Sequence, residues 1–548
     1  MSASPRLRAA DVSRRGFLGG LALATVGGPL LTACGSSGGA STAAGPRAVL
    51  PTQVPFSGPV PDLAGDLAKA INPGYFRYPV DQLVRSVTDE VGSGGEMSAF
   101  VVTFSAPPPQ AAKNAYWQAI NDALGVDFKP TLVPTDFATK LAAVMTGGDI
   151  PDLVTMYLRD AAGLRRFDDL AKARFADLTD HLSGDAIKDY PNLARLPREA
   201  WPATLVDGRI YATPTLRIPT GYTVFYQPEV FEKYGANPAP RTPDEVREMC
   251  ATFTDARANR YAMADGTWMT GPLMYPMFDV PNNWSIDGDG NLTKDWESDG
   301  FLDCVDYIKG LWDKGYIHPD APSEGFDAEP LFENGSVAVR SDNMVRYTVR
   351  NDSGLNPAIM SAYSSDGTPT TLQASVTDFV TFVKKGDDAR VQECLRVLNW
   401  LSAPFGSEEN FLRTYGVEGV DHRLDAGLPT LTSQGEAEVY SLSLRFIAGG
   451  PDVLYSTIGD TGMVETMHTY QGDVSPGRVE DPTSGLRSDA DVGATNLKQK
   501  VTDTMTDVIV GRKPMADLES AIDTWRTEAG DKVRAEYEEA IAARDRLA

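Results

Sequence analysis

The chain has 548 residues and a formal net charge of −25, with 75 acidic and 50 basic side chains. This length allows roughly two to four domains. The acidic balance excludes nucleic acid as a partner, because such binding depends on Lys and Arg at the phosphates. It also argues against a polyanionic ligand, although a local pocket can differ from the mean, and we interpret it as a solvated, self-repelling surface.

Residues 1–34 read as targeting sequence. Arg14 and Arg15 precede an apolar run over 16–31, which is the pattern of a twin-arginine export signal. The segment 31–35, LTACG, resembles a bacterial lipobox, so Cys34 is the predicted lipidation site, with palmitate among the acyl chains. Two or more acyl chains suffice for stable membrane attachment.

Three cysteines remain if Cys34 is lipidated: Cys250, Cys304 and Cys394. An odd number is not a disulfide framework, so buried free thiols are expected. The sequence leaves open whether Cys250 and Cys304 pair.

Residues 35–96 are predicted to form a flexible tether and then a proline-rich N-terminal arm, with Tyr75, Phe76 and Tyr78 as its anchors. From Met97 the pattern changes to alternating strands and helices. Strands are predicted over 99–104, 128–133 and 153–156, and helices over 115–124 and 136–146.

The order strand–helix–strand–helix–strand indicates a parallel sheet covered by helices. Ligands of such sheets bind beyond the carboxyl ends of the strands. Those ends are predicted at Ser105, Asp136 and Tyr157.

The rest of the chain repeats the mixture of strands and helices. Strands are predicted over 222–226 and 375–383, and helices from Thr242 and over 301–315 and 388–400, with three more after Asn496. We favour a two-residue hairpin turn at Asp289-Gly290 over a calcium loop. An EF-hand needs Gly and Glu where this chain has Leu292 and Ser298, so no metal site is predicted.

Several segments resemble the family 1 extracellular solute-binding proteins, the capture subunits of bacterial sugar ABC importers. The resemblance is clearest over 137–153, where Gly147-Gly148-Asp149-Ile150-Pro151-Asp152 is similar to the family's SGD-x-PD block. It extends to 208–214, 332–340 and 415–420 and is closest to long lipoprotein members associated with complex oligosaccharides. It implies an α/β, periplasmic-binding-protein-like (type II) fold, with two α/β lobes joined by a hinge and the ligand in the interlobe cleft.

On this resemblance the chain divides into four parts. Residues 1–34 are the signal and 35–96 the tether and arm. Residues 97–215 plus about 370–425 form lobe 1, and residues 216–369 plus about 426–548 form lobe 2.

A sugar site needs flat aromatic faces for the CH groups of the rings and fixed polar partners for the hydroxyls. The stacking candidates are Trp284, Trp268, Tyr226 and Tyr157, and the hydrogen-bonding candidates are Asp136, Ser105, Arg340 and Asp342. Each has a structural alternative. The aromatic residues can belong to the core, Asp136 can be a helix N-cap, and Arg340 can form an ion pair with Asp342.

The resemblance implies a monomeric, lipid-anchored protein on the outer face of the cytoplasmic membrane. Such a protein captures a carbohydrate, an oligosaccharide on this resemblance, and delivers it to the permease subunits of an ABC importer. We expect no catalysis, no cofactor and no metal. One alternative is a secreted glycoside hydrolase, which needs two carboxylates facing each other across a cleft. Another is the same fold with a peptide or other small solute as ligand.

Overall fold

The computed structural model describes residues 48–264, 270–323, 325–344, 355 and 357–546. The contacts divide the chain into residues 1–46 and 47–548. The predicted export signal, the lipobox with Cys34, the start of the tether and Trp268 lie outside the described residues.

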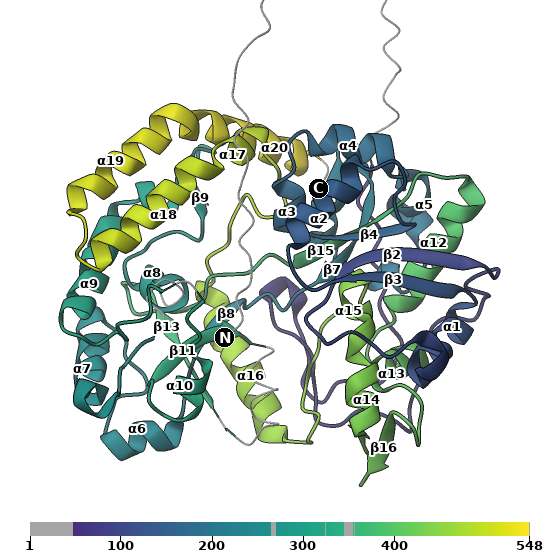
Figure 1. The fold of residues 1–548 in the computed structure, drawn as a ribbon, viewed down its shortest axis with the longest axis horizontal. Helices are drawn as coiled ribbons and strands as arrows, with labels where there is room; N and C mark the ends of the chain where they lie inside the picture. The colour runs from purple at the N-terminus through teal and green to yellow at the C-terminus, as the bar shows by residue number, and fades with distance from the viewer. Residues whose placement is uncertain (1–47, 265–269, 324, 345–354, 356, 547–548) are drawn as a thin grey trace, which may run out of the picture. The chain divides into compact units, whose positions relative to one another are not determined.

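A five-stranded sheet forms the first lobe, with the strand order β3–β2–β4–β15–β7 (Figure 1). Its strands are β2 (Glu96–Val102), β3 (Asp127–Val133), β4 (Leu153–Tyr157), β7 (Ala212–Leu216) and β15 (Thr377–Val383). Strand β2 pairs in parallel with β3 and β4, and β15 pairs antiparallel with β4 and β7. All five residues of β4 are buried, as expected for a central strand covered on both faces. The predicted parallel strands are confirmed.

The helices of this lobe bury their apolar faces against the sheet or against one another. They are α1 (Ala115–Leu124), α2 (Phe137–Thr146), α3 (Leu158–Ala162), α4 (Phe167–Arg174), α5 (Thr179–Leu182), α12 (Asp388–Leu401), α13 (Glu408–Tyr415), α14 (Ser433–Glu438) and α15 (Leu444–Ile447). Helix α1 begins where Asn114 accepts a hydrogen bond from the Trp117 amide at 2.7 Å, and it buries Ile120 and Leu124.

The second lobe contains a smaller antiparallel sheet of strands β11 (Val339–Asn343), β8 (Tyr222–Tyr226) and β12 (Ala358–Met360), in that order. Its main helices are α6 (Pro228–Tyr234), α7 (Pro243–Phe253), α9 (Asp299–Asp313), α10 (Glu329–Glu333), α18 (Thr495–Ile509), α19 (Met515–Trp525) and α20 (Asp531–Asp545). Figure 1 shows α18 next to α19 and close to α9. Trp525 and Tyr537 share one core with α7 and α9, so the three predicted C-terminal helices are confirmed and pack on this lobe.

Three chain segments pass between the lobes: 217–221 links β7 to β8, 371–376 leads into β15, and 448–454 follows α15. The first two lie against each other, since the Ala374 amide donates to the Pro219 carbonyl at 2.9 Å. Gly221 has a φ of +62°, and a Cβ there would approach the Leu372 carbonyl oxygen at 3.1 Å. The close packing of these segments therefore requires glycine at this position.

The N-terminal arm visits both lobes. It begins on lobe 1, where Val54 N–H donates to the Ala194 carbonyl at 2.7 Å. It then reaches helix α16 (Thr461–Val474), where Asn72 N–H donates to Gln471 Oε1 at 2.8 Å, and α16 packs against Phe225 of the second lobe. It returns to lobe 1 at Tyr78, whose hydroxyl donates to Asn410 at 2.8 Å. Tyr75 and Tyr78 are buried, which confirms them as anchors.

Two sequence expectations need correction. The chain over 433–448, expected in lobe 2, contributes Val439, Leu444 and Ile447 to the core of the first lobe, so this stretch packs with lobe 1. Strands β9 (Trp284–Ile286) and β10 (Leu292–Lys294) do form a hairpin around Asp289-Gly290, but its loop spans 287–291 instead of two residues.

Cys250, Cys304 and Cys394 are buried free thiols, as expected, so Cys250 and Cys304 do not pair. Burial raises the pKa of the Cys250 and Cys394 thiols to about 12, which keeps them protonated and unreactive.

Candidate functional site

The carboxyl ends of β2 and β4 reach the same edge of the first sheet. Strand β2 is followed by Phe104 and Ser105, and β4 ends at Tyr157, with Arg159 two residues beyond. Strand β15 runs in the opposite direction and pairs Phe379 with Tyr157. The antiparallel strand therefore adds the side chains near its own beginning to the carboxyl edge of the parallel strands.

An aromatic surface covers this edge. The Tyr157 ring lies 4.2 Å from that of Phe379, centroid to centroid, and Phe379 lies 5.0 Å from Phe446, which α15 supplies. Phe104 stands edge-on to Phe446 at 5.6 Å and is 68% exposed. Exposing so large an aromatic side chain is unfavourable without a partner, and flat aromatic faces suit the CH faces of sugar rings.

Three arginines surround the aromatic surface. The Arg159 guanidinium lies 4.2 Å from the Tyr157 ring centroid, and that of Arg445 lies 4.7 Å from Phe446. Arg217, directly after β7, lies 5.5 Å from the Tyr222 ring and donates to Asp378 at 3.4 Å. Burial raises the pKa of the Tyr157 hydroxyl, and the charges of Arg159 and Arg217 act in the opposite direction.

Two cavities adjoin the connecting segments, with volumes of about 850 Å³ and 490 Å³. Both are lined by Arg217, Gln373, Ala374, Ser375, Asp481 and Ser484. The larger also contacts Thr377 and Asp452, and the smaller contacts Tyr222 and Tyr275. Residues of both lobes line this space, which has the size of a small-molecule site.

Tyr222 is the aromatic residue most open to the smaller cavity. It begins β8 directly after the connecting segment 217–221, and its side chain is 39% exposed. Tyr275 also lines this cavity, and burial raises its pKa well above the ordinary value. We therefore regard Tyr222 as a stacking position.

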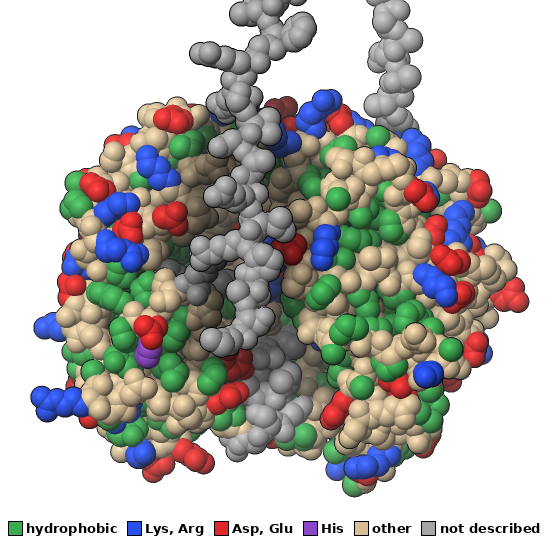
Figure 2. All heavy atoms as spheres, in the orientation of Figure 1, with side chains coloured by type: hydrophobic (Ala, Val, Ile, Leu, Met, Phe, Trp, Pro, Cys, Tyr) green, Lys and Arg blue, Asp and Glu red, His purple; other side chains and the backbone are tan. Residues whose placement is uncertain are grey.

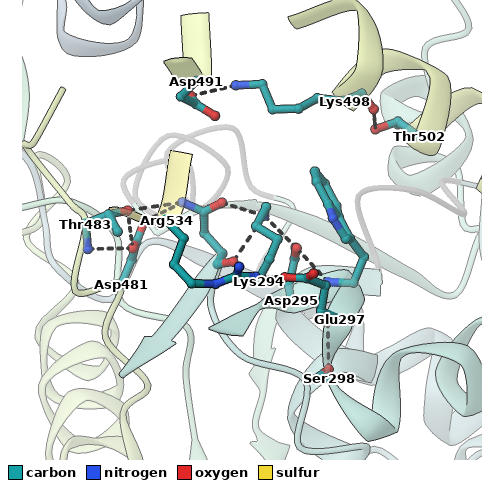
Figure 3. A network of polar contacts seen from close by, with 12 residues as sticks. Lys294, Asp295, Glu297, Ser298, Asp481, Thr483, Asp491, Lys498, Thr502 and Arg534 are labelled. Carbon is teal, nitrogen blue, oxygen red and sulfur yellow. Dashed lines mark hydrogen bonds and ion pairs between the residues drawn. The ribbon is translucent and has the colours of Figure 1, made fainter. Parts of the chain in front are cut away.

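A polar network holds the segment around Asp481 against the second lobe (Figure 3). Lys294 is 4% exposed and donates to Asn283 Oδ1 at 2.7 Å and to Asp295 at 2.5 Å. Asn283 in turn donates to Asp481 at 2.8 Å, and Thr483 donates to the same carboxylate at 2.7 Å. Burial nevertheless raises the pKa of Asp481.

All three stacking candidates in the described residues lie outside the cavities, and Tyr157, 9% exposed, belongs to the core of the first lobe. Trp284 is 2% exposed and packs 6.1 Å from Trp525 and 6.0 Å from Tyr537, inside the second core, so its predicted stacking role does not fit this position. Tyr226 is half-buried against Phe231 at 4.8 Å and does not line either cavity. Their apolar environment explains the difference, because large aromatic residues are most often core residues.

The polar candidates also separate. Ser105 lies at the aromatic edge and donates to the Tyr440 carbonyl at 3.3 Å. Asp136 is exposed before α2 with a φ of +53°, and its side chain makes no capping hydrogen bond. Arg340 pairs with Glu329 at 3.1 Å and with Asp342 at 3.7 Å on β11, which agrees with the structural alternative for both residues.

Sequence reasoning missed most of the residues that surround Tyr157. Phe104 and Arg159 were predictable, since Phe104 ends one predicted strand and Arg159 follows another. Arg445 and Phe446 were not, because they come from a distant short helix with no motif of its own.

Among the residues that the structure describes, no group of three or more His, Cys, Asp or Glu side chains is placed to hold a metal ion. In that same part of the chain, no helix has both the length and the apolarity that a bilayer crossing requires. The space-filling view shows acidic and basic side chains interspersed over the visible surface (Figure 2).

Comparisons with known proteins agree with this architecture. No family model matches the chain. A polygalacturonan/rhamnogalacturonan-binding protein of Bacillus subtilis (strain 168), YtcQ, is 21% identical over 459 residues, which cover 79% of this chain and 89% of that protein. Lipoprotein LipO of the same organism is 20% identical over 456 residues, which cover 78% of this chain and 88% of LipO.

Among solved structures, the alginate-binding protein AlgQ2 without calcium ion matches with a TM-score of 0.60 and 13% identity, covering 84% of this chain and all of that one. The fold is therefore that of the periplasmic-binding-protein-like (type II) class, as predicted. Together with the two relatives, it confirms the resemblance to the family 1 extracellular solute-binding proteins.

Proposed function

We propose that this chain is an extracellular solute-binding protein that captures a carbohydrate, in particular an oligosaccharide, and delivers it to the permease subunits of an ABC importer. The observation that carries the proposal is the pair of cavities that residues of both lobes line, with Arg217 in the wall of both and the partly exposed Tyr222 in the wall of the smaller. Aromatic faces and polar groups at an interlobe cleft are what a sugar requires. The relatives named above are a polysaccharide-binding protein and a lipoprotein, and neither is described as an enzyme.

We further propose that the protein is monomeric and exported by the twin-arginine route, with Cys34 lipidated at the outer face of the cytoplasmic membrane. The support is the order of twin arginine, apolar run and lipobox in the sequence.

Ligand-induced stabilisation tests the binding function. The mature protein is melted with a panel of neutral and acidic oligosaccharides, peptides and polyols. A ligand at 100 times its dissociation constant adds about 2.7 kcal/mol to the free energy of unfolding. We expect a rise in melting temperature with at least one oligosaccharide and none with peptides, and stabilisation by peptides alone would overturn the carbohydrate assignment.

The hydrolase alternative has its own measurement. Each stabilising oligosaccharide is incubated with the protein for an extended time and analysed for new reducing ends. We expect the glycan to remain intact, and enzyme-dependent release of reducing ends would favour the hydrolase.

A further inference from the structure

The arginines at the aromatic edge differ in how their charge is balanced. Arg217 donates to Asp378, so its charge is largely compensated. Arg159 is exposed, and its nearest carboxylate, Asp160, lies 4.0 Å away. Arg445 is exposed and forms no ion pair with any of the described residues, while its guanidinium lies 4.7 Å from the ring of Phe446. Positive charge is therefore left over at this edge of an otherwise acidic protein.

The surroundings of Arg445 favour a fixed anionic partner. Arg445 is exposed beside the rings of Phe446 and Tyr440, 4.7 Å and 5.9 Å from their centroids, and desolvation lowers the pKa of its guanidinium. The Tyr157 hydroxyl feels the charges of Arg159, Arg217 and Arg445, so all three arginines converge on one ring. A partly desolvated cation without a counterion gains most from a carboxylate, which a guanidinium can bind with two parallel hydrogen bonds.

The carboxylates lining the larger cavity do not cancel this charge. Burial raises the pKa of Asp452 to about 6 and also raises that of Asp481. Glu480 pairs with Arg478 at 3.1 Å. None of the carboxylates that line this cavity, exposed Glu199 among them, forms an ion pair with Arg159 or Arg445 among the described residues.

We propose that the ligand is an anionic oligosaccharide rich in uronate, with a sugar carboxylate bound between Arg159 and Arg445 and a ring face against the exposed side chain of Phe104. This inference rests on the proposed carbohydrate-binding function and names the class of carbohydrate. It runs against the negative net charge of the chain, which describes the whole surface and not this edge.

Titration calorimetry tests the inference with four probes: trigalacturonate, its methyl ester, a trimer of mannuronate and a sulfated neutral trisaccharide. The methyl ester keeps the sugar backbone and removes the charge. We expect at least one of the two uronate trimers to bind. If trigalacturonate binds, its methyl ester should bind about 10-fold to 100-fold more weakly, which is the usual range for the loss of charge-assisted hydrogen bonds.

Arg445→Gln and Arg159→Gln should each weaken binding of the uronate by about 10-fold or more and weaken binding of its methyl ester much less. Arg445→Lys should fall between, since it keeps the charge and loses the fork. Arg423→Gln, on the hairpin of β16 (His422–Asp425) and β17 (Leu428–Leu431), is the matched control, because Arg423 is an exposed arginine that pairs with Asp425. Melting curves without ligand confirm that the variants fold.

The outcomes separate the two proposals. Equal binding of acid and ester, a failure of both uronate trimers to bind, or a loss of affinity in Arg423→Gln as large as in Arg445→Gln would overturn the uronate inference. Binding of the sulfated sugar alone would overturn the carboxylate as the recognised anion. Neutral oligosaccharides that bind while uronates do not would leave the proposed function standing, whereas stabilisation by peptides alone would overturn both.

Discussion

At the scale of single residues, a position at the end of a predicted strand indicated the candidate site better than residue type did. Tyr157 and Ser105 were identified because the carboxyl ends of parallel strands converge at one edge, and the structure places both there. Trp284 was chosen because aromatic residues stack on sugars, but residue type alone does not tell a core position from an exposed one. Its neighbours Trp525 and Tyr537 come from C-terminal helices that no local pattern links to residue 284.

Tyr222→Ala should weaken glycan binding by about 5-fold to 30-fold, because the lost aromatic contact is worth about 1–2 kcal/mol. The partial exposure of Tyr222 next to Arg217 motivates the choice. Calorimetric titration of the best ligand from the panel measures the effect. Leu424→Ala, at an exposed residue on the β16 strand, is the control, and unchanged affinity in Tyr222→Ala would remove Tyr222 from the site.

Trp284→Ala should act on stability and not on affinity. Removing this buried ring should lower the free energy of unfolding by about 3–5 kcal/mol, as expected for a large-to-small change in a core. Urea denaturation measures this, and Trp284→Phe should cost less. A stable variant with weakened ligand binding would return Trp284 to the binding site.

At the scale of secondary-structure elements, helices were predictable where an N-cap residue is followed by apolar residues at helical spacing. Helix α7 illustrates this. Thr242 caps it by accepting from the Glu245 amide at 3.3 Å, Pro243 occupies its first turn, and its buried face is the predicted one. The packing of 433–448 was not predictable, since these short helices carry no long period and their partners lie far away in the sequence.

The arm and α13 meet at one buried carboxylate. Glu409 is 6% exposed and accepts from the Ser86 amide, the Ser86 hydroxyl and the Val87 amide, at 2.8–3.0 Å. Glu409→Ala leaves these buried donors without a partner, so we expect the free energy of unfolding to fall by about 2–4 kcal/mol and proteolysis of the arm to speed up.

Glu408→Ala is the matched control, because its side chain is exposed on the same turn of α13. Urea denaturation and limited proteolysis provide the two readouts. Equal stability of the two variants would show that Glu409 does not hold the arm.

At the scale of the whole molecule, stability should depend on the ionisation of Asp452 between the lobes. Burial and the nearby Asp378 raise its pKa to about 6, against the opposing effect of Arg413. A carboxyl with a raised folded-state pKa contributes its stability below the unfolded pKa of about 3.9 and loses it as the pH rises through 6.

Asp452→Asn should therefore become more stable relative to the parent as the pH rises from 4 to 7, by at most about 3 kcal/mol. Melting temperatures across this range measure the difference, with Asp425→Asn on the exposed hairpin as the control. A difference that does not change with pH would show that Asp452 does not titrate between pH 4 and 7.

Membrane attachment is a property of the whole chain that the sequence predicts. Cys34→Ala should release the exported protein from the membrane fraction, because the acyl chains are its predicted anchor. Fractionation followed by immunoblotting measures this, and a variant that stays in the membrane fraction would contradict lipidation at Cys34.

The N-terminal arm leaves the first lobe, contacts α16 and returns to the first lobe at Tyr78. It therefore links the two lobes independently of the three connecting segments. Neither lobe can be separated as a self-contained domain, because each would lose the part of the arm that packs on its surface. Cleavage of the chain between Val54 and Leu63 would break one of these links and leave every proposed ligand contact intact. Cleavage there would change how readily the two lobes separate without altering the proposed sugar site.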